Sequence, residues 1–468
     1  MNVEGIIKAS NLNRGNLIDS LNSSGLGVVF LVNENNKLCG CISDGDLRRS
    51  SNGTDISNLI VKDVITAPTK AIAQTILRRR PALKVIPIVD ESKEIIHLIG
   101  IEDLLTFGLV SQSFNGNEAK NIMECLSTGW ISSQGRFVTE FEESFNVLLQ
   151  GNHSVACSNG TSALHLCLLA LGIGPDDEVI VPDVTFAATI NAVIYVGAIP
   201  VIADVDQHGV MTTGTIQAQI TERTKAVIHV HLYGWPGGIG EIANMCSEQE
   251  ILLIEDCAEA LGSTENDRIA GSFGDASSFS FFGNKTITTG EGGMACFKEK
   301  EHHDLAKIYR DHGMSKERRY WHDLVGYNYR MTNLQAAIGV AQLERIDEII
   351  DKKLNLAKYY SDALEPIASL LLPPQSDACL NTYWLYVITL KGRDVSFRDN
   401  LIQELNIRNM EVRPAFYCLS DMPKYKEYAR AATPTAHEFA NNSLCLPSST
   451  DLTADNVQEI SLVLSDIL

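Results

Sequence analysis

Lys285 stands in a segment whose residue types can carry covalent chemistry. It follows the aromatic-rich stretch 278–282 and precedes a glycine-rich turn at residues 290–293. An amine held between two such elements suits an imine bond, or Schiff base, with an aldehyde cofactor. A lysine near a glycine turn is by itself usually a surface lysine, so this prediction depends on what other segments supply.

Asp256 is the second residue of interest, because it lies at the end of the apolar stretch 251–254. An unpaired carboxylate at the end of a buried strand is costly to desolvate, so we expect Asp256 to face a cation such as a protonated pyridine nitrogen. That pairing would keep the ring protonated and make it an electron sink. A helix cap or a structural ion pair is the alternative role.

The small residues 157–162 open an amphipathic helix pattern and indicate a phosphate site. The free N–H groups and the dipole of a helix start can hold a phosphate, with Thr161 or Ser162 adding hydroxyl bonds. A plain Ser/Thr cap is the alternative. Ser280 could donate to the same phosphate, and Phe186 could stack on a flat ring, although most single Phe residues at such places are core. Together with Lys285 and Asp256, these segments predict a site for pyridoxal phosphate.

The elements that must position these residues follow from the hydrophobic pattern. Helical patterns alternate with apolar, β-branched stretches at residues 178–181, 200–203, 226–230 and 251–254. This alternation predicts an α/β domain with a parallel, doubly wound sheet covered by helices on both faces, whose ligands bind where strands end. After about residue 350 a second pattern, starting with the apolar stretch 383–388, predicts a smaller α+β lobe.

Residues 1–110 contain two similar halves. Each half runs from a helix pattern into a pair of short apolar strands and then into an acidic helix start. The polar residues 111–117 lack periodicity and are typical of a linker. We therefore predict an N-terminal module at residues 1–112, a linker at 113–118, a large domain at 119–350 and a small domain at 351–468.

Composition limits the classes of function. A chain of 468 residues is too long for one core, and its 45% hydrophobic and 21% charged residues predict that it folds throughout. The net charge is -20, and because residues 1–115 hold equal numbers of acidic and basic residues, the whole excess lies in the rest. Such a charge repels nucleic acid and anionic membranes, so we expect neither as a partner.

The cysteines and the apolar segments indicate the compartment. The 11 cysteines are scattered, without a CxxC pair, which favours a set of reduced thiols and predicts no metal site. No stretch is as long as a membrane-spanning helix, and Met1 is not followed by a basic and then apolar leader pattern. We expect a soluble, cytoplasmic protein.

The first 110 residues resemble a tandem pair of CBS domains, regulatory modules that often bind adenosine nucleotides between their halves. The resemblance implies that Ser43 and Asp46 contact ribose and phosphate, and that Asp103 is the counterpart in the second half. That half departs from the pattern, because Gly100 stands where a Ser or Thr is expected. A hydroxyl and a carboxylate at a helix start can equally form a cap, so both roles stay open.

Residues from about 118 to 468 are similar to the DegT/DnrJ/EryC1/StrS family of nucleotide-sugar aminotransferases, which have the fold type I architecture of aspartate aminotransferase. The resemblance implies an obligate homodimer with composite sites, in which Asn328 reaches the cofactor phosphate of the neighbouring subunit. The other implied positions are the Schiff-base lysine Lys285, the pyridine-nitrogen aspartate Asp256, the phosphate turn Gly160, Thr161 and Ser162, the stacking Phe186 and the strand serine Ser280.

One position departs from this family. Three residues after Asp256, where many members carry Gln or His, this chain has Glu259. A carboxylate there would repel the cofactor's phenolate oxygen unless it is protonated or turned away, so the role of Glu259 stays open. Lys285 itself favours transamination over the family's dehydratase branch, in which a histidine replaces the lysine.

The resemblance implies that L-glutamate donates the amino group and that a keto-sugar nucleotide accepts it. Residues 282–293 and 318–322 look most like the perosamine synthases, which aminate C4 of GDP-4-keto-6-deoxymannose. A UDP- or dTDP-linked keto-sugar is the alternative substrate. The product would feed a surface polysaccharide such as a lipopolysaccharide O-antigen. A function of another class is a sensor that binds cofactor and nucleotide without turnover, and a third is a transaminase controlled by nucleotide at the N-terminal module.

Overall fold

The computed structural model describes residues 5–50, 54–104 and 106–468. The chain forms two compact units. Unit 1 contains the chain up to residue 107 together with residues 403–411 and 459–468, and unit 2 contains residues 108–402 and 412–458. Each unit has hydrophobic clusters of its own. The subdivision of the larger part at residue 350 stays a prediction.

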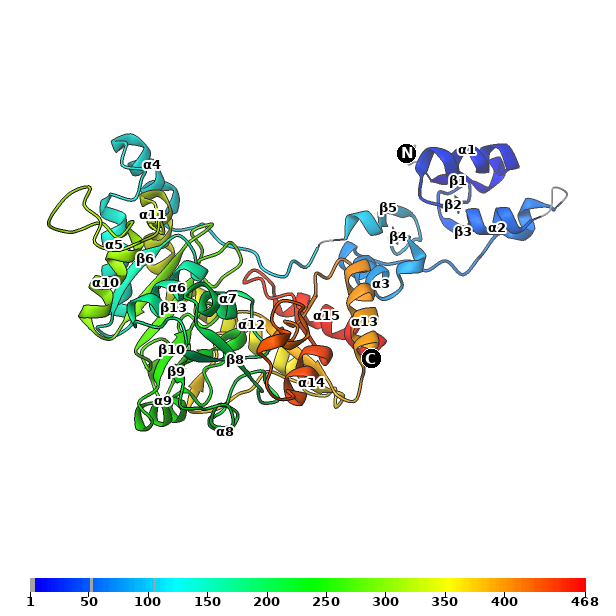
Figure 1. Cartoon of the computed structure of the whole chain (residues 1–468). Helices are drawn as coiled ribbons and strands as arrows, with labels where there is room; N and C mark the ends of the chain where they lie inside the picture. Colours follow the sequence, from blue (N-terminus) through cyan, green and yellow to red (C-terminus); the bar gives the residue numbers. More distant parts are fainter. Residues whose placement is uncertain (1–4, 51–53, 105) are drawn as a thin grey trace. The chain divides into compact units, whose positions relative to one another are not determined.

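A seven-stranded sheet forms the centre of unit 2, with the strand order β6-β14-β13-β10-β9-β7-β8 (Figure 1). The strands are β6 (His153–Cys157), β7 (Glu178–Pro182), β8 (Ile199–Ala203), β9 (Thr224–Val230), β10 (Leu252–Asp256), β13 (Ala276–Ser280) and β14 (Gly293–Phe297). Neighbours among β8, β7, β9, β10 and β13 pair in parallel. The predicted all-parallel sheet is wrong at β14, which is antiparallel to both β13 and β6.

The antiparallel strand has a simple cause. A parallel return needs a crossover, usually a helix, but residues 281–292 between β13 and β14 contain no helix. The chain therefore turns back beside β13, and Lys285 lies in this turn.

Helices cover both faces of the sheet, which explains its nearly continuous apolar strands. On β7, Val179 and Val181 belong to one cluster, whereas Ile180 belongs to another on the opposite face. The helices of this part are α4 (Glu118–Thr128), α5 (Arg136–Leu148), α6 (Gly160–Ala170), α7 (Ala188–Tyr195), α8 (Thr213–Gln217), α9 (Ile239–Glu248), α10 (Lys300–Arg310) and α11 (Asn333–Leu343), with the short 3-10 helix η5 (Leu232–Gly234).

The rest of unit 2 follows α12 (Ile346–Leu364) and contains an antiparallel sheet in the order β15-β17-β19-β18. Its strands are β15 (Leu370–Leu371), β17 (Tyr386–Leu390), β18 (Arg413–Pro414) and β19 (Ser443–Leu446). A small sheet combines β11 (Thr264–Glu265), β12 (Arg268–Ile269) and β16 (Cys379–Leu380). The remaining helices are α13 (Val395–Ile407), α14 (Pro434–Asn442), α15 (Ala454–Ile467), η6 (Leu419–Asp421) and η7 (Lys426–Tyr428).

Unit 1 contains the two similar halves that the sequence predicts. The first half comprises β1 (Ile6–Lys8), η1 (Ala9–Asn11), α1 (Arg14–Ser24), β2 (Val28–Val32), β3 (Leu38–Ser43) and α2 (Asp44–Arg49). After η2 (Ile56–Leu59), the second half comprises α3 (Lys70–Arg79), η3 (Pro81–Leu83), β4 (Val85–Val89), β5 (Ile95–Gly100) and η4 (Ile101–Asp103).

The pairing repeats as well. β1 is parallel to β2, and Ala67 bridges Ile88 in parallel in the second half. Each half then forms an antiparallel hairpin, β2–β3 or β4–β5, with a register shift near the end of its first strand. The second half differs at its end, where the 3-10 helix η4 stands in place of an α-helix.

The carboxyl-terminal ends of α13 and α15 belong to unit 1, which the sequence did not predict. They lie beside α3 (Figure 1), where the guanidinium of Arg78 is only 1% exposed. Arg78 pairs with Glu459 at 2.9 Å and donates to the carbonyl of Arg408 at 2.8 Å. Arg78 therefore has a structural role in unit 1. Among the described residues, no helix is both long and apolar enough to cross a membrane.

Lys353 of α12 is a buried amine that joins two separate segments of unit 2. It is 3% exposed, and its Nζ donates to the carbonyls of Trp384 at 3.0 Å and Ser448 at 2.7 Å. Burial lowers the pKa of Lys353 to about 7. The amine therefore holds two backbone segments together while avoiding a buried charge at alkaline pH.

We expect the stability contributed by Lys353 to rise with pH. Between about pH 7 and pH 10 the unfolded chain keeps a proton that the folded chain releases, so the free energy of unfolding of the parent rises relative to Lys353→Met. Urea unfolding midpoints at pH 7 and pH 9.5 measure this difference. Lys352→Met, at the half-buried neighbouring lysine, is the control. A difference between parent and Lys353→Met that stays constant with pH would contradict the assignment.

Candidate active site

A cavity of about 730 Å³ lies where the central strands of unit 2 end. It collects residues from β10, β13, the start of α6, the loop after β7 and the turn after β13. The predicted site residues that line it are Gly160, Thr161, Ser162, Phe186, Asp256, Glu259, Ser280 and Lys285. Residues from four distant segments of the sequence thus meet in one cavity, as the doubly wound pattern predicts.

The start of α6 has the form of an anion site. Asn159 caps the helix by accepting from the N–H of Ser162 at 2.8 Å, while the Ser162 hydroxyl donates to the carbonyl of Asn159 at 2.7 Å. A Cβ on Gly160 would lie 2.8 Å from the Cβ of Ser280, so only glycine fits there without displacement. The helix start and Ser280 are therefore in close contact, and a phosphate bound there would meet the helix dipole.

Asp256, which lines the same cavity, is oriented by hydrogen bonds. Its side chain is nearly buried and accepts from the hydroxyl of Thr189 at 2.9 Å and from the N–H of Ala258 at 3.2 Å. Burial raises the pKa of Asp256, while these hydrogen bonds and Lys285 act in the opposite direction. A cation beside this carboxylate would offset its desolvation.

Lys285 reaches the same cavity from the turn after β13. Its Nζ lies 3.5 Å from Oε1 of Glu259 and 3.7 Å from the centroid of the Trp384 ring. Burial lowers the pKa of Lys285, whereas the carboxylates of Glu259 and Asp256 act to raise it. A lowered pKa increases the fraction of neutral amine, the form that can attack an aldehyde or accept a proton.

Glu259, the departure from the family pattern, has a defined position. Its Oε2 accepts from the N–H of Tyr233 at 2.8 Å, and its Oε1 faces Lys285. Burial raises the pKa of Glu259, with Lys285 acting in the opposite direction. Each carboxylate oxygen of Glu259 therefore has a partner that holds the side chain in place.

Three aromatic residues of the cavity wall were not predicted from the sequence. The ring of Tyr233 lies between those of Trp384 and Phe416, with centroids 6.0 and 5.5 Å away and interplanar angles of 11° and 14°. Tyr233 also has a φ of 53°, a left-handed conformation that is rare for an aromatic residue and common at functional sites. Its isolated position in the sequence gave no signal of this role.

Two predicted residues are more exposed than the others. Phe186 is 61% exposed and its ring lies 6.0 Å from that of Phe416, at the edge of the cavity. Asn328 does not line the cavity of its own chain, and its Oδ1 accepts from Nε of Arg330 at 3.2 Å.

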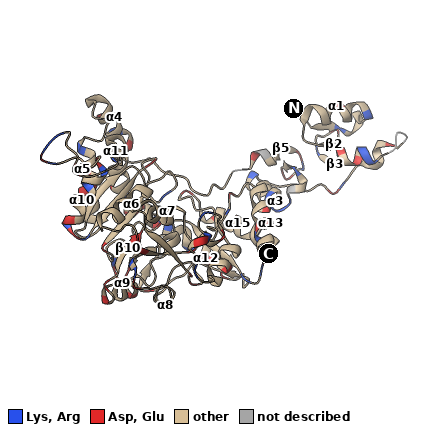
Figure 2. Ribbon diagram, in the orientation of Figure 1, with Lys and Arg blue, Asp and Glu red and all other residues tan. Residues whose placement is uncertain are grey.

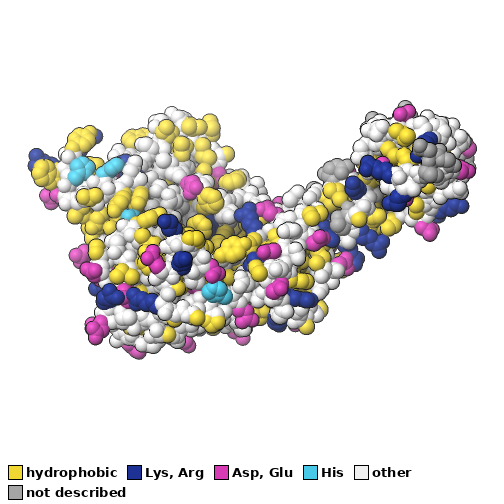
Figure 3. All heavy atoms as spheres, turned by 45° about the vertical axis from the view of Figure 1, so that its right-hand side comes forward, with side chains coloured by type: hydrophobic (Ala, Val, Ile, Leu, Met, Phe, Trp, Pro, Cys, Tyr) yellow, Lys and Arg dark blue, Asp and Glu magenta, His cyan; other side chains and the backbone are white. Residues whose placement is uncertain are grey.

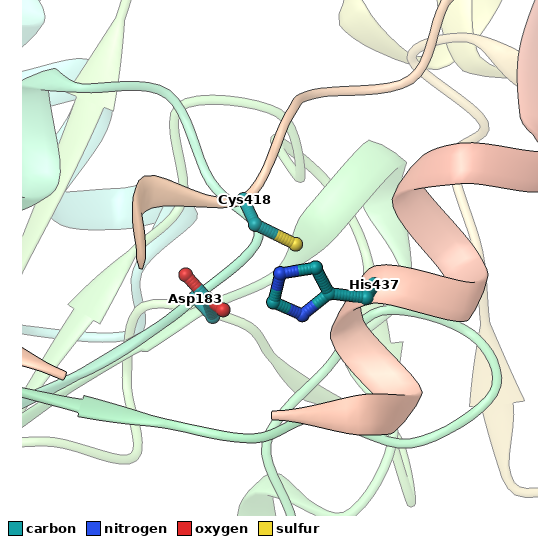
Figure 4. A group of neighbouring side chains, drawn as sticks. All are labelled: Asp183, Cys418 and His437. Atoms are coloured by element: carbon teal, nitrogen blue, oxygen red, sulfur yellow. The ribbon is translucent and has the colours of Figure 1, made fainter. Parts of the chain in front are cut away.

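A second group of polar side chains includes Asp183, which belongs to the same loop as Phe186. Figure 4 shows Asp183, Cys418 and His437 pointing toward one another from two loops and α14, and potential ligand atoms of the three lie within 4.8 Å. Asp183 already accepts from the N–H and hydroxyl of Ser420 at 2.8 and 2.7 Å and from Thr433 at 2.5 Å. We interpret the group as a hydrogen-bonded link between the loop after β7 and the C-terminal part of unit 2.

Comparison with known proteins relates this site to a family. The model of the DegT/DnrJ/EryC1/StrS aminotransferase family matches residues 112–465. The GDP-perosamine synthase of Vibrio cholerae is 42% identical over 74% of this chain and 95% of its own length. The GDP-perosamine synthase of Caulobacter vibrioides is 40% identical over 79% of this chain and 100% of its own length.

Solved structures agree with this result. The PLP-form of the putative sugar aminotransferase Spr1654 from Streptococcus pneumoniae has a TM-score of 0.73 and 26% identity, covering 78% of this chain and 99% of its own. The Helicobacter pylori aminotransferase PseC, involved in the biosynthesis of pseudoaminic acid, has a TM-score of 0.73 and 25% identity with the same coverage. The architecture is that of fold type I transferases.

The residues present fit pyridoxal phosphate, the cofactor of these proteins. The start of α6 with Gly160 offers a cradle for the phosphate, Asp256 a carboxylate for the ring nitrogen, and Lys285 an amine for the aldehyde. The match of both sequence and structure extends over nearly the whole length of the relatives. The chain belongs to the DegT/DnrJ/EryC1/StrS aminotransferase family of pyridoxal phosphate-dependent enzymes.

Proposed function

We propose that the protein transfers the amino group of L-glutamate to C4 of GDP-4-keto-6-deoxymannose and so forms GDP-perosamine. The observation that carries this proposal is the single cavity in which Lys285 and Asp256 meet the start of α6. Identities of 40–42% to two GDP-perosamine synthases, over nearly their whole length, support the choice of sugar and base. We propose that the product serves the synthesis of a surface polysaccharide such as an O-antigen.

A UDP-linked sugar is the alternative substrate. The UDP-N-acetyl-3-dehydro-alpha-D-glucosamine 3-aminotransferase of Acidithiobacillus ferrooxidans is 36% identical over 67% of this chain and 83% of its own length. The lower identity makes it the second choice.

Asp256 and Lys285 would have different roles in the reaction. Pyridoxal phosphate, when bound, supplies an aldehyde carbon and a ring that withdraws electrons. Asp256 would keep the ring nitrogen protonated, and Thr189 holds that carboxylate in place. Lys285 would hold the cofactor between reactions and move a proton between cofactor and sugar when its amine is free, a role that suits its lowered pKa.

Exposed aromatic and apolar side chains support a homodimer with composite sites. Tyr320 is 75% exposed, Trp321 51% and Val325 88%, all in the segment before Asn328. Figure 3 shows hydrophobic side chains reaching the surface of unit 2 in several places. A second copy that covers this segment would bury them and bring Asn328 toward the neighbouring phosphate.

The repeat in unit 1 supports a CBS-like regulatory module that binds an adenine nucleotide. At α2, Ser43 Oγ lies 2.6 Å from Oδ2 of Asp46 in a capping box, and the acidic start and basic end of this helix match its dipole (Figure 2). In the second half, Asp103 accepts from the N–H of Gly100 at 2.9 Å. All 11 cysteines are free, which supports a reducing, cytoplasmic compartment.

The first test is amino transfer itself. We expect purified protein with L-glutamate to change its cofactor absorption to that of the amine form, and then to aminate GDP-4-keto-6-deoxymannose in preference to UDP- and dTDP-keto-sugars. Products are identified by mass and NMR. Lys285→Arg should lower the rate by about 10²–10⁴-fold, because it loses the proton carrier. A spectrum that glutamate leaves unchanged would favour the sensor instead.

Glu259→Gln tests the environment of Lys285. Removing the carboxylate that stabilises the ammonium should lower the pKa of Lys285 further, so the apo-protein should take up pyridoxal phosphate at a lower pH than the parent. Stopped-flow absorption across a pH series gives the midpoint of this uptake. Glu265→Gln, which changes a carboxylate outside the cavity, is the control. A midpoint that moves upward would refute this role of Glu259.

Nucleotides test the N-terminal module. If it is regulatory, AMP or ATP should change the rate of amino transfer by the full-length parent, and Asp46→Asn should abolish that response without changing the basal rate. Calorimetric titration with the same nucleotides measures binding directly. Equal rates with and without nucleotides, together with an absence of binding heat, would discard a nucleotide-responsive module.

A further inference from the structure

The backbone on both sides of Lys285 is held by side chains from distant segments. The carbonyl of Asn284, just before the lysine, accepts from Nε1 of Trp384 at 2.6 Å. The carbonyl of Lys285 itself accepts from Nε2 of Gln112 at 2.6 Å. Two different parts of unit 2 therefore hold the two peptide groups that flank one Cα atom.

This arrangement fixes the direction of the lysine side chain. Because each peptide group is planar, only φ and ψ of Lys285 vary between the two held groups. Fixing both planes therefore fixes the direction of the Cα–Cβ bond, from which the amine extends into the cavity. Trp384 adds a second constraint, since its ring lies 3.7 Å from Nζ.

Gln112 is itself held on a short segment, residues 108–113, which we call the strap. At one end, the carbonyl of Leu109 accepts from the N–H of Ser448 at 2.7 Å, and Leu109 is only 4% exposed. At the other end, the carbonyl of Ser113 accepts from Nε2 of Gln342 at 3.0 Å. The strap is therefore fixed on both sides of Gln112.

The strap with Gln112 and the segment with Trp384, which hold the two carbonyls, are both linked to Lys353. Lys353 donates to the carbonyl of Trp384 at 3.0 Å and to the carbonyl of Ser448 at 2.7 Å, and Ser448 in turn holds the strap at Leu109. These hydrogen bonds connect the lysine turn, the strap and the Trp384 segment in a continuous ring. Movement of the strap is therefore opposed by the Trp384 segment, and movement of that segment by the strap.

We propose that Gln112 is a positioning residue, which sets the direction of the Lys285 side chain by holding the lysine's own carbonyl through the strap. The proposal rests on the proposed role of Lys285 in the reaction. Gln112 donates to the backbone carbonyl of Lys285, so it acts through the lysine. A misplacement of about 1 Å at a reacting group can lower a rate by about 10²-fold, so a bond of this kind can matter although it lies outside the chemistry.

The test is Gln112→Glu, which keeps the size of the side chain but, when ionised, cannot donate to the carbonyl. At pH 8 we expect kcat to fall by about 10- to 100-fold, with a smaller change in KM for the keto-sugar. The new carboxylate would face a carbonyl oxygen at a half-buried position, which raises its pKa above that of a free glutamate. As the pH falls toward 5.5, a growing fraction of the variant should therefore gain a proton and donate again, so the ratio of variant to parent kcat should rise.

A readout independent of turnover is the rate at which apo-protein takes up pyridoxal phosphate. We expect this rate to fall in Gln112→Glu and in Gln112→Ala, while the thermal unfolding midpoint stays within about 2 °C of the parent, as for a surface change. Ser111→Ala, on the strap but bonded to Asp451, and the exposed change Gln249→Glu are matched controls that should behave as the parent does.

The outcomes separate the two claims. If Lys285→Arg is inactive while both Gln112 variants match the parent in kcat and in cofactor uptake, the positioning role of Gln112 is wrong and the proposed function stands. If Lys285→Arg retains full activity, the proposed function fails. If the Gln112 variants lose activity only in proportion to a lowered unfolding midpoint, the residue has a general structural role and the proposal is overturned.

Discussion

The nearly buried amine of Lys285, placed between a carboxylate and an indole ring, is the interaction around which the cavity of unit 2 is arranged. A lysine is costly to bury unless its charge is offset, and here Glu259 and Trp384 supply that offset at 3.5 and 3.7 Å. Glu259 needs a support of its own, which the N–H of Tyr233 gives. Tyr233 adopts a left-handed backbone conformation at the point where it makes this bond. The backbone strain at Tyr233 is therefore part of the structure that surrounds Lys285.

The sheet topology serves the same site. β10 brings Asp256 to the cavity, and the helix-free return from β13 to β14 brings Lys285 there from the neighbouring strand. The start of α6 approaches β13 closely because Gly160 has no side chain. Each of these three elements would be unremarkable alone. They converge at the carboxyl ends of the strands and form one cavity, whose wall carries a carboxylate, an amine and an anion-binding helix start.

The sequence predicted the parts of the site that depend on local pattern. Asp256 lies at the end of a strand, Gly160 at the start of a helix and Lys285 in the turn after a strand, where residue type and position together carry the signal. Gln112 and Trp384 gave no such signal, because their contacts with the lysine turn join residues about 100 or more positions apart. The antiparallel course of β14 was missed because apolar strands of either direction look alike when both faces are buried. The burial of Arg78 was missed because its partner Glu459 lies near the far end of the chain.

The strap also begins at one of the points where the chain passes between the two units. The first segment of unit 1 ends at residue 107, and the next residue begins the strap that carries Gln112. A pull along the backbone at this junction would act first on the hydrogen bond between Ser448 and Leu109, which lies between the junction and Gln112. A shift of the preceding backbone would therefore have to break this bond before it could displace Gln112 and, through it, the carbonyl of Lys285.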